Sequence, residues 1–201
     1  MSAHEQRVPV TLAMTGASGA PYAVRLLQAL NDARVPVRLV ISKTGWRLLH
    51  EELDITSEAQ LRERTGDWSD VILYSDEDRG ATPASGSAPS RGMVVCPCSM
   101  GTLASIAQGT TRSLIERAAD VVLKERRRLV LVPRETPYSL IHLENMLRLT
   151  HAGAVILPAS PGFYHRPRGL DDLVEFVVGR VLSQLGVEHS VGPRWQSGEP
   201  D

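Results

Sequence analysis

Short continuous runs of Val, Leu and Ile recur along the chain, and stretches with helical periodicity separate them. Such runs are typical of strands that are buried on both faces. Strands of this kind, joined by helices, form a parallel sheet that helices cover on both sides. The expected strands are Val8–Met14, Pro36–Ile41, Val71–Tyr74, Met93–Cys96, Leu129–Val132 and Ala154–Leu157. The expected helices are Pro21–Ala33, Gly45–Leu53, Met100–Ala107, Leu114–Arg126, Ser139–His151 and Leu170–Leu185.

The length of 201 residues suits one domain with a sizeable core, so we expect a single domain over 1–201 with flexible tails at 1–7 and 196–201. The net charge is −1, and neither half of the chain is strongly basic, which argues against a nucleic-acid partner. Residues 1–7 lack a signal-peptide core, and no apolar run approaches the ~20 residues of a membrane span. We therefore expect a cytoplasmic protein without a membrane partner.

The two cysteines, Cys96 and Cys98, flank Pro97 at the end of an expected strand. Two cysteines one residue apart on an extended chain do not readily form a disulfide. The six histidines are scattered, and no H-E-x-x-H pattern is present. We expect two buried thiols and no metal site.

After two of the expected strands, the chain enters a loop that leads into a helix and could bind a ligand. The loop Thr15–Ala20 is a glycine-bearing turn, which frees backbone N–H groups for a phosphate or an electron-rich cofactor ring. Within this loop, the hydroxyl of Ser18 lies where a ligand would pass. A second helix start, Ser99–Thr102, follows Met93–Cys96 and offers hydroxyls and free N–H groups at a positive dipole end. Two such starts favour a shared cofactor site over ordinary capping.

Ligands of a parallel sheet bind at the carboxyl ends of its strands. The longest segment assigned to this edge, Asp76–Gly92, has 17 residues, of which 11 are Gly, Ala, Ser or Pro. Its centre, Ala84–Ser87, could wrap an anion, although a flexible solvated loop is an equal alternative. The segments expected at this edge are Thr15–Ala20, Ser42-Lys43, Asp76–Gly92, Pro97–Thr102, Pro133–Pro137 and Pro158–Pro167.

Several charged residues suit an anionic ligand. Arg117 and Lys124 are seven residues apart on one expected helix, so they form either an anion clamp or a solvated face. Arg134 follows a buried strand and suits a phosphate or carboxylate, while the adjacent Glu135 can move protons. A surface ion pair is the alternative for these two residues.

The loop Pro161–Pro167 is aromatic and basic in a chain with only 4% aromatic residues. Arg180 lies 16 residues after Tyr164, in the last expected helix, from which it could fold back toward the loop. Rings beside cations suit a ligand that is apolar at one end and anionic at the other. Trp195, near the end of the chain, could shield a site or cover a neighbouring subunit.

Together these segments resemble the flavin prenyltransferase family, the UbiX and Pad group. The resemblance covers about residues 8–195, while Leu53–Tyr74 carries no family motif. It implies an α/β, three-layer flavodoxin-like (Rossmann-like) fold with a mostly parallel sheet and helices on both faces. The motifs that carry it are Thr15–Ala20, Ser42-Lys43, Ala84–Ser87, Pro97–Ser99, Glu116–Val121, Leu123–Arg127, Pro133–Pro137 and Gly162–Pro167.

The family resemblance also implies an activity. Members of the family join the dimethylallyl group of dimethylallyl monophosphate to N5 and C6 of reduced FMN and release phosphate, without a metal. The product, prenylated FMN, is the cofactor of UbiD-type decarboxylases. The resemblance implies FMN sites at the interfaces of a homo-oligomer built from trimers, typically a dodecamer.

Matching positions imply three groups of site residues. Ser18 is expected to orient flavin N5, Glu135 to protonate the leaving phosphate, and Glu52 to act as a second acid or base. The positions matched to FMN binding are Gly16, Ala17, Ser18, Ser42, Ser99, Met100, Gly101, Thr102 and Arg134. The positions matched to the prenyl phosphate substrate are Ser85, Gly86, Arg117, Lys124, Tyr164, Arg180 and Trp195.

Three alternatives share parts of this pattern. Flavin-dependent decarboxylases of the phosphopantothenoylcysteine or lantibiotic type have the same fold, but carry a Pro-Ala-Ser-Ala-Asn-Thr-like loop where this chain has Pro97–Thr102. They also use a histidine that has no evident counterpart here. A direct aromatic-acid decarboxylase and a non-catalytic FMN carrier are the other two alternatives.

Overall fold

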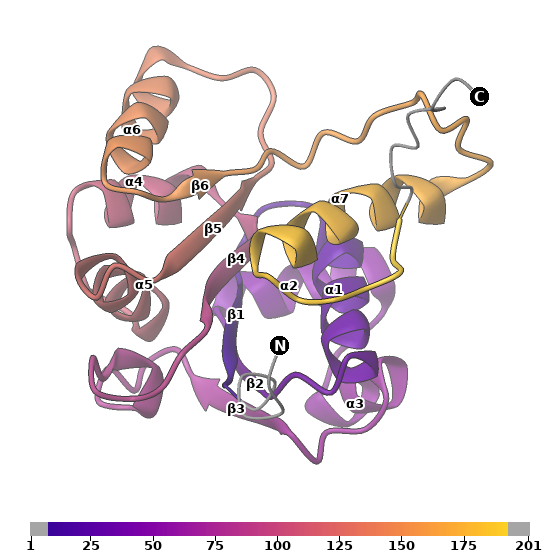
Figure 1. Cartoon of the computed structure of the whole chain (residues 1–201), viewed down its shortest axis with the longest axis horizontal. Coiled ribbons are helices and arrows are strands. Elements are labelled where there is room, and N and C mark those ends of the chain that lie inside the picture. Colours follow the sequence, from indigo (N-terminus) through magenta and orange to yellow (C-terminus); the bar gives the residue numbers. More distant parts are fainter. Residues whose placement is uncertain (1–7, 193–201) are drawn as a thin grey trace, which may run out of the picture.

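A six-stranded sheet forms the middle layer of the computed structural model, which describes residues 8–192 (Figure 1). Every neighbouring pair of strands is parallel, in the order β3-β2-β1-β4-β5-β6. Trp195 and the predicted tails, 1–7 and 196–201, lie outside the described residues. The strands are β1 (Val10–Met14), β2 (Val37–Ile41), β3 (Val71–Ser75), β4 (Gly92–Cys98), β5 (Arg128–Pro133) and β6 (Val155–Ile156).

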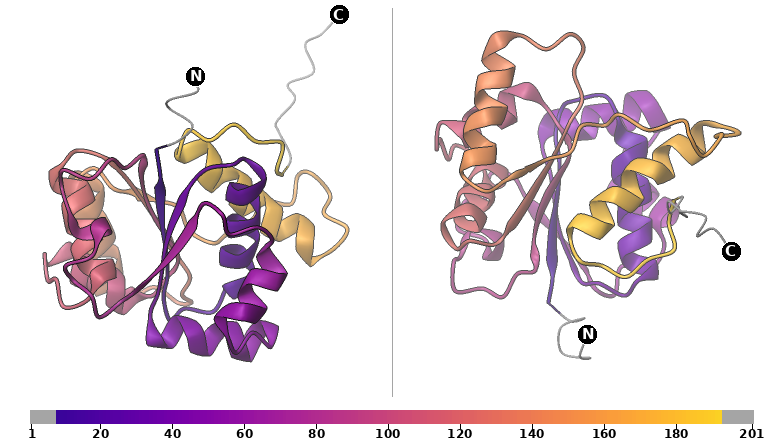
Figure 2. Two further views of the ribbon diagram at one scale, coloured as in Figure 1. Left: turned by 90° about the horizontal axis from the view of Figure 1, so that it is seen from below. Right: turned by 45° about the horizontal axis from the view of Figure 1, so that its top comes forward.

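Helices cover both faces of the sheet (Figures 1 and 2). One layer consists of α1 (Ala20–Asp32), α2 (Lys43–Leu53), α3 (Glu58–Thr65) and α7 (Leu170–Gln184). The other consists of α4 (Met100–Ala107), α5 (Leu114–Lys124) and α6 (Leu140–His151). The predicted three-layer α/β fold is therefore confirmed.

Alternation along the strands divides the core into two parts. In β1, Leu12 and Met14 contact the core beneath α1 and α7, whereas Ala13 belongs to the core beneath α4 and α5. The helices pack apolar side chains against the sheet; Leu26 and Leu30 of α1, for example, are fully buried. Burying a leucine side chain stabilises the fold by about 1.5–3 kcal/mol, so each layer is held by its apolar face.

All six predicted strands and all six predicted helices are present, with small shifts at their ends. One helix, α3, lies in the segment where we predicted no element. Its sequence is polar, and only Leu61 and Thr65 are buried, so it has no apolar periodicity to detect. A single 3-10 turn, η2 (Thr82–Ala84), interrupts the long segment before β4.

The strand order reverses at β1. The chain runs outward from β1 through β2 to β3, then returns to place β4 on the other side of β1. The loops that follow β1 and β4 diverge from adjacent strand ends, and this is where open α/β sheets bind ligands. The topology therefore selects the carboxyl ends of β1 and β4 as the candidate site.

Both cysteines are buried and free, as predicted. A register irregularity in β4 lies between Val95 and Cys98, around a cis peptide bond at Pro97. As a result Cys96 contacts the core on the α1 face, whereas Cys98 contacts the core on the α4 face. The two thiols thus lie in different cores.

Burial should make both thiols unreactive in the folded protein. Burial raises the pKa of Cys98 to about 12 and raises that of Cys96 further above its ordinary value. Since the thiolate is the reactive form, we expect no labelling by a disulfide reagent at pH 8, and two thiols per chain after unfolding in guanidinium. A Ser87→Cys variant, exposed on the loop before β4, is the positive control. Stoichiometric labelling of the native wild-type protein would contradict the expectation.

Candidate functional site

The side chain of Thr15 ties the loop after β1 to the loop after β4. Its hydroxyl donates a hydrogen bond to the carbonyl of Pro97 at 2.8 Å and accepts one from the N–H of Ser99 at 2.9 Å. The backbone N–H of Thr15 also donates to Pro97, at 3.2 Å. Thr15 is 2% exposed, so these bonds are shielded from water. The two predicted helix starts therefore lie side by side.

The carboxylate of Glu52, on α2, closes the start of α1. One carboxylate oxygen accepts hydrogen bonds from the N–H groups of Gly19 at 2.9 Å and Ala20 at 2.7 Å. Gly19 stands at the N-cap with a φ of 130° and has no side chain to fill this role. An anion at the positive end of a helix is favourable. Glu52 therefore lies against the loop that carries Ser18.

The loops after β1 and β2 approach each other closely. Ser42 caps α2 by accepting a hydrogen bond from the N–H of Gly45 at 3.0 Å, and its hydroxyl lies 3.1 Å from that of Thr44. A Cβ added at Gly16 would lie 2.5 Å from the Cβ and hydroxyl of Thr44. Only glycine at position 16 allows this contact. Thr44 was not predicted as a site residue, because its role depends on this approach between two loops.

The loops after β4 and β5 complete an edge that we call the flavin rim. Ser99 caps α4 by accepting a hydrogen bond from the N–H of Thr102 at 3.3 Å, and its backbone is fixed by Thr15. Arg134 donates through Nε to the carbonyl of Ser18 at 3.1 Å. The flavin rim consists of the nine predicted FMN positions, which are Gly16, Ala17, Ser18, Ser42, Ser99, Met100, Gly101, Thr102 and Arg134.

The flavin rim fits FMN in its chemistry. Arg134 provides a cation for the phosphate. The N–H groups of Gly19 and Ala20 at the start of α1, however, are bonded to Glu52 and are not free as predicted. The Ser18 side chain is exposed, so its hydroxyl is accessible to a ligand. Glu135 follows Arg134 directly, and its carboxylate accepts a hydrogen bond from the N–H of Thr136 at 2.9 Å. The predicted catalytic residues Ser18, Glu52 and Glu135 thus come from segments that meet at or beside this edge.

One part of the predicted substrate site lies at the opposite edge of the sheet. A Cβ added at Gly86 would lie 2.9 Å from Nζ of Lys124, at the end of α5. Arg127 donates hydrogen bonds to the carbonyls of Gly86 at 2.7 Å and Ala88 at 3.0 Å. Since β5 begins at Arg128, this group lies beside its amino end. The expectation that Ser85 and Gly86 lie at the carboxyl edge is therefore wrong: the segment after β3 runs back along the sheet before β4 begins.

The two cations of α5 both have carboxylate partners within the chain. Arg117 pairs with Asp120 at 3.1 Å, and Lys124 pairs with Glu125. Lys124 lowers the pKa of Glu125 through a hydrogen bond and its charge. All four side chains are substantially exposed, and exposed pairs contribute little stability. A bound anion can therefore replace these carboxylates at small cost.

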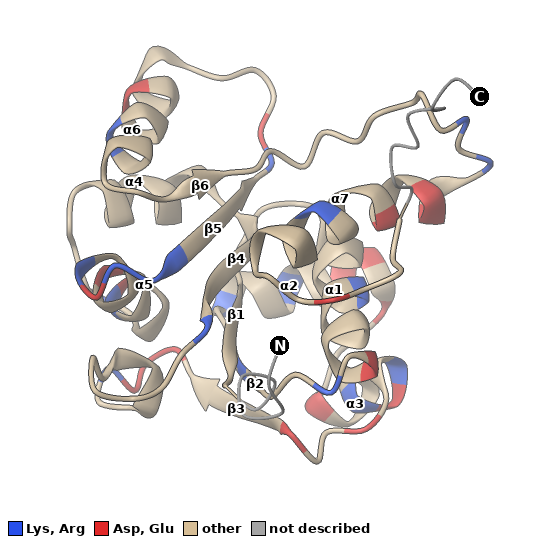
Figure 3. Cartoon of the chain, in the orientation of Figure 1, with Lys and Arg blue, Asp and Glu red and all other residues tan. Residues whose placement is uncertain are grey.

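Tyr164 and Arg180 lie on the other side of the sheet. Tyr164 packs edge-on to Phe176 of α7, with ring centroids 5.8 Å apart, and Arg180 is exposed on the same helix. The basic positions of α5 and α7 are on opposite sides of the sheet (Figure 3). The structure therefore does not bring the predicted phosphate ligands together within one chain.

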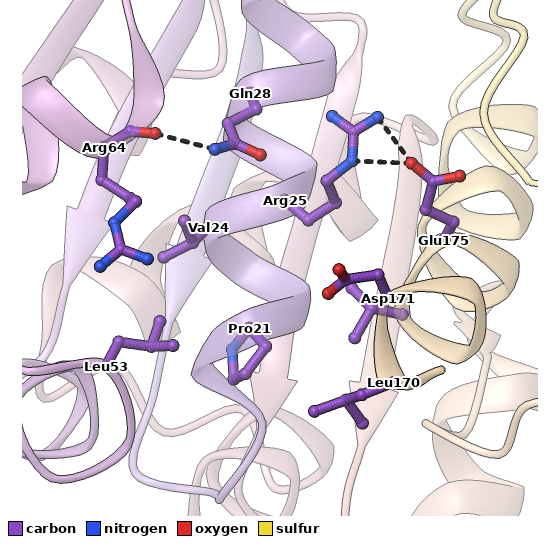
Figure 4. Close-up of a pocket in the computed structure, with 10 residues that line it drawn as sticks. Pro21, Val24, Arg25, Gln28, Leu53, Arg64, Leu170, Asp171 and Glu175 are labelled. Atoms are coloured by element: carbon purple, nitrogen blue, oxygen red, sulfur yellow. Dashed lines mark hydrogen bonds and ion pairs between the residues drawn. The ribbon is translucent and has the colours of Figure 1, made fainter. Parts of the chain in front are cut away.

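A hollow of about 390 Å³ lies between α1, α3 and the start of α7 (Figure 4). Its lining includes Arg25, which pairs with Glu175 at 3.0 Å, and the apolar side chains of Val24 and Leu53. None of the predicted site residues lines it, so this hollow is not the predicted flavin site.

Two further findings concern metal binding and membrane-spanning helices. Among residues 8–192, no three His, Cys, Asp or Glu side chains are grouped so that they could hold a metal ion. Within the same range, no helix combines the length and apolarity needed to cross a lipid bilayer.

Comparison with known proteins places this geometry among flavoproteins. The Flavoprotein family model matches residues 1–182. The flavin prenyltransferase UbiX of Pseudomonas aeruginosa is 52% identical over 194 residues, which cover 92% of this chain and 93% of that protein.

Two solved structures have the same architecture. AnUbiX (PadA1), in complex with FMN and dimethylallyl pyrophosphate, superposes with a TM-score of 0.89 at 42% identity, covering 96% of this chain and 100% of that one. A dodecameric FMN-dependent UbiX-like decarboxylase from Escherichia coli O157:H7 has a TM-score of 0.87 at 46% identity, covering 94% and 100%.

We predict that the flavin rim keeps its geometry only when residue 15 carries a hydroxyl group. Thr15→Val keeps the side-chain shape but leaves the N–H of Ser99 without its partner, at a cost of about 1–3 kcal/mol. The lost hydrogen bond also holds the two loops together, so we expect the affinity for FMN to fall about tenfold. Titration of FMN fluorescence measures this. Thr15→Ser retains the hydroxyl and is the matched control; equal FMN affinity in the Val and Ser variants would contradict the role given to Thr15.

Proposed function

The chain belongs to the flavin prenyltransferase family, and on this premise we propose that it joins the dimethylallyl group of dimethylallyl monophosphate to N5 and C6 of reduced FMN, releasing phosphate. The observation that supports this most directly is the flavin rim, where Thr15 and Arg134 fix the loops after β1, β4 and β5 around the exposed Ser18. FMN, when bound, supplies the two atoms that are alkylated. The chain itself supplies orientation, charge and protons.

Ser18 and Glu52 are the groups proposed to act near N5. The backbone of Ser18 is held by Arg134 on its carbonyl, and the next two N–H groups are held by Glu52. The loop is thus fixed on both sides of a side chain that remains exposed. In this proposal the Ser18 hydroxyl orients N5, and the Glu52 carboxylate accepts or returns a proton there or during ring closure.

The substrate phosphate is proposed to bind the residues of the second group. Arg117, Lys124 and Arg180 are cations that stabilise a departing phosphate in place of a metal ion. Ser85 and Gly86 add a hydroxyl and a backbone N–H. The ring of Tyr164 can also steady positive charge on the allylic carbon. Trp195 belongs to this proposal as well, although it lies outside the described residues.

Neighbouring subunits are proposed to complete the site. Within one chain, Lys124 and Ser85 lie at the amino edge of the sheet, while Ser18 lies at the carboxyl edge. A homo-oligomer of trimers, in the form of a dodecamer, would bring these surfaces together. The relative from Escherichia coli O157:H7 is described as dodecameric. The proposed recipient of the product is a UbiD-type decarboxylase.

An exposed apolar surface supports assembly. On α6, the exposed fractions are 70% for Leu140, 50% for Leu143 and 57% for Leu147. These positions follow one another along one side of the helix, whereas Met146 and Leu149 face the core. A contiguous apolar patch of this kind is typical of a protein–protein interface. We propose that α6 packs against another copy of the chain.

The catalytic proposal predicts a specific product and a specific defect. Anaerobic incubation with reduced FMN and dimethylallyl monophosphate should yield flavin heavier by one prenyl unit, measured by mass spectrometry. Glu135→Gln should slow this reaction about 100-fold with FMN affinity unchanged, because an amide keeps the shape but not the proton. Glu188→Gln, exposed and remote, is the matched control.

Each outcome of this assay separates the candidate functions. Absence of prenylated flavin with the wild-type protein would overturn the prenyltransferase proposal, and release of unchanged FMN to an acceptor would favour a carrier. Unchanged turnover in Glu135→Gln would remove this residue from the mechanism while leaving the activity established.

The interface proposal predicts dissociation of the assembly. Replacing both Leu143 and Leu147 by Glu removes about 1.5–3 kcal/mol of burial per side chain and places charges in the interface. We expect light scattering to show a shift from the wild-type mass to smaller assemblies of the 22.0 kDa chain. Ile72→Glu, at a 57% exposed position on β3, is the control. An unchanged mass for the α6 variant would exclude this surface.

A further inference from the structure

The backbone forms a β-turn at residues 85–88, in the long segment before β4. The N–H of Ala88 donates to the carbonyl of Ser85 at 3.3 Å, and the hydroxyl of Ser85 lies 3.1 Å from that of Ser87. This turn uses the carbonyl of Ser85 and leaves those of Gly86 and Ala88 for other partners. Since Ser85 and Gly86 are proposed phosphate ligands, whatever holds the turn also places them.

The side chain of Arg127, which directly precedes β5, holds both of these carbonyls. Its Nη2 donates to the carbonyl of Gly86 at 2.7 Å, and its Nη1 donates to that of Ala88 at 3.0 Å. The N–H groups of a guanidinium have a fixed fork geometry, so two such bonds set both the distance and the orientation of the turn. The turn is therefore attached to the end of α5.

The way in which α5 ends brings Arg127 to the turn. The N–H of Arg126 donates to the carbonyl of Leu123 at 3.0 Å, and the N–H of Arg127 donates to that of Val122 at 2.9 Å. This pair of bonds is a Schellman motif, which ends a helix through a residue in the left-handed conformation. That residue is Arg126, with a φ of 57°. The backbone reverses there, and the next side chain reaches the turn.

The same helix end carries Lys124, another proposed phosphate ligand. A Cβ added at Gly86 would lie 2.9 Å from Nζ of Lys124 and 2.5 Å from Oε1 of Glu125. The backbone of the turn thus lies directly against the ammonium group, and only glycine at position 86 permits this approach. Arg127 and Lys124 hold and contact the same turn from one helix end.

Ser85 lies between two anchored parts of the chain. Before it, η2 is anchored by the buried Pro83, and the N–H of Ser85 donates to the carbonyl of Thr82 at 3.1 Å. After it, Arg127 holds the turn. The Ser85 side chain itself is exposed. Its hydroxyl is therefore placed from both sides while remaining open to a ligand.

We propose that Arg127 is a positioning residue for Ser85: by holding the carbonyls of Gly86 and Ala88, it fixes the Ser85 hydroxyl beside Lys124 to bind the phosphate of the prenyl substrate. The proposal rests on the proposed function, in which Ser85 and Lys124 bind that phosphate. It assigns to Arg127 no contact with the substrate. The sequence gives no sign of this role, because the two carbonyls lie 41 and 39 positions from Arg127.

Replacing the guanidinium by an ammonium tests the fork. Arg127→Lys keeps the charge but not the two parallel donors, so we expect KM for dimethylallyl monophosphate to rise about tenfold. The lost phosphate contact is made in the ground state and the transition state alike, so kcat should change less than about twofold. FMN affinity should also change less than twofold, because the flavin rim lies at the other edge of the sheet.

The adjacent arginine provides the matched control. Arg128 is exposed and donates through Nη1 to Oε1 of Gln184 at 3.0 Å, away from the turn. Arg128→Lys should leave KM within about twofold of the wild-type value. An unchanged KM in Arg127→Lys, or an equal rise in Arg128→Lys, would overturn the proposal.

A double-mutant cycle tests whether Arg127 acts through Ser85. Ser85→Ala removes the hydroxyl and should itself raise KM about tenfold. In that background Arg127→Lys should raise KM by less than about twofold, because the contact that it positions is already lost. Two tenfold effects that multiply in the double variant would show that Arg127 acts independently of the Ser85 hydroxyl, against the proposal.

Amide hydrogen exchange of the full protein provides a readout that does not depend on activity. The N–H groups of Ser85 and Ala88 are both hydrogen-bonded in the wild-type protein, and Arg127→Lys should speed their exchange at least fivefold. Exchange in the loop Thr15–Ala20 should stay unchanged, as should exchange of the turn in Arg128→Lys. If the wild-type protein transfers no prenyl group, the proposed function fails, and the exchange rates alone then decide whether Arg127 holds the turn. Unchanged exchange of the turn in Arg127→Lys would overturn the inference.

Discussion

The buried hydroxyl of Thr15 joins the two halves of the sheet at the point where the strand order reverses. Strand ends at such a point diverge, and their loops would otherwise be independent of each other. One side chain, bonded to Pro97 and to Ser99, sets the distance between them. The start of α4 is tied to β1 by this connection, and Arg134 reaches the carbonyl of Ser18 from the loop after β5.

In the rest of the flavin rim, side chains from neighbouring elements hold the loop after β1. Glu52 supplies from α2 the cap that Gly19 lacks, so a carboxylate is bound to the start of α1 beside Ser18. Gly16 leaves room for Thr44, which brings α2 against the same loop. A loop fixed in this way can present Ser18 without burying it. Orientation at the rim is thus a property of the packing of α1 and α2.

The other half of the proposed site follows a different principle. Its cations lie on helices that cover opposite faces of the sheet, and Ser85 lies at the edge away from the flavin rim. No rearrangement within a sheet of this topology brings these groups together, because the sheet itself separates them. In the proposed assembly, these groups come close together because they belong to neighbouring copies of the chain. The exposed leucines of α6 form a surface through which the copies can pack.

The sequence by itself determined the strands and most helices, because continuous apolar runs and helical periodicity reflect burial directly. It missed α3, where only Leu61 and Thr65 are buried, and it could not place Cys96 and Cys98 in different cores, since an irregularity in β4 decides that. It identified the loops of the flavin rim, because parallel strands share one carboxyl edge. Only the tertiary structure revealed the Thr15 bond to residues 82 and 84 positions away, and the separation of Ser85 from Ser18. Contacts between distant segments depend on how the layers pack, and the local sequence pattern does not indicate which segments come together.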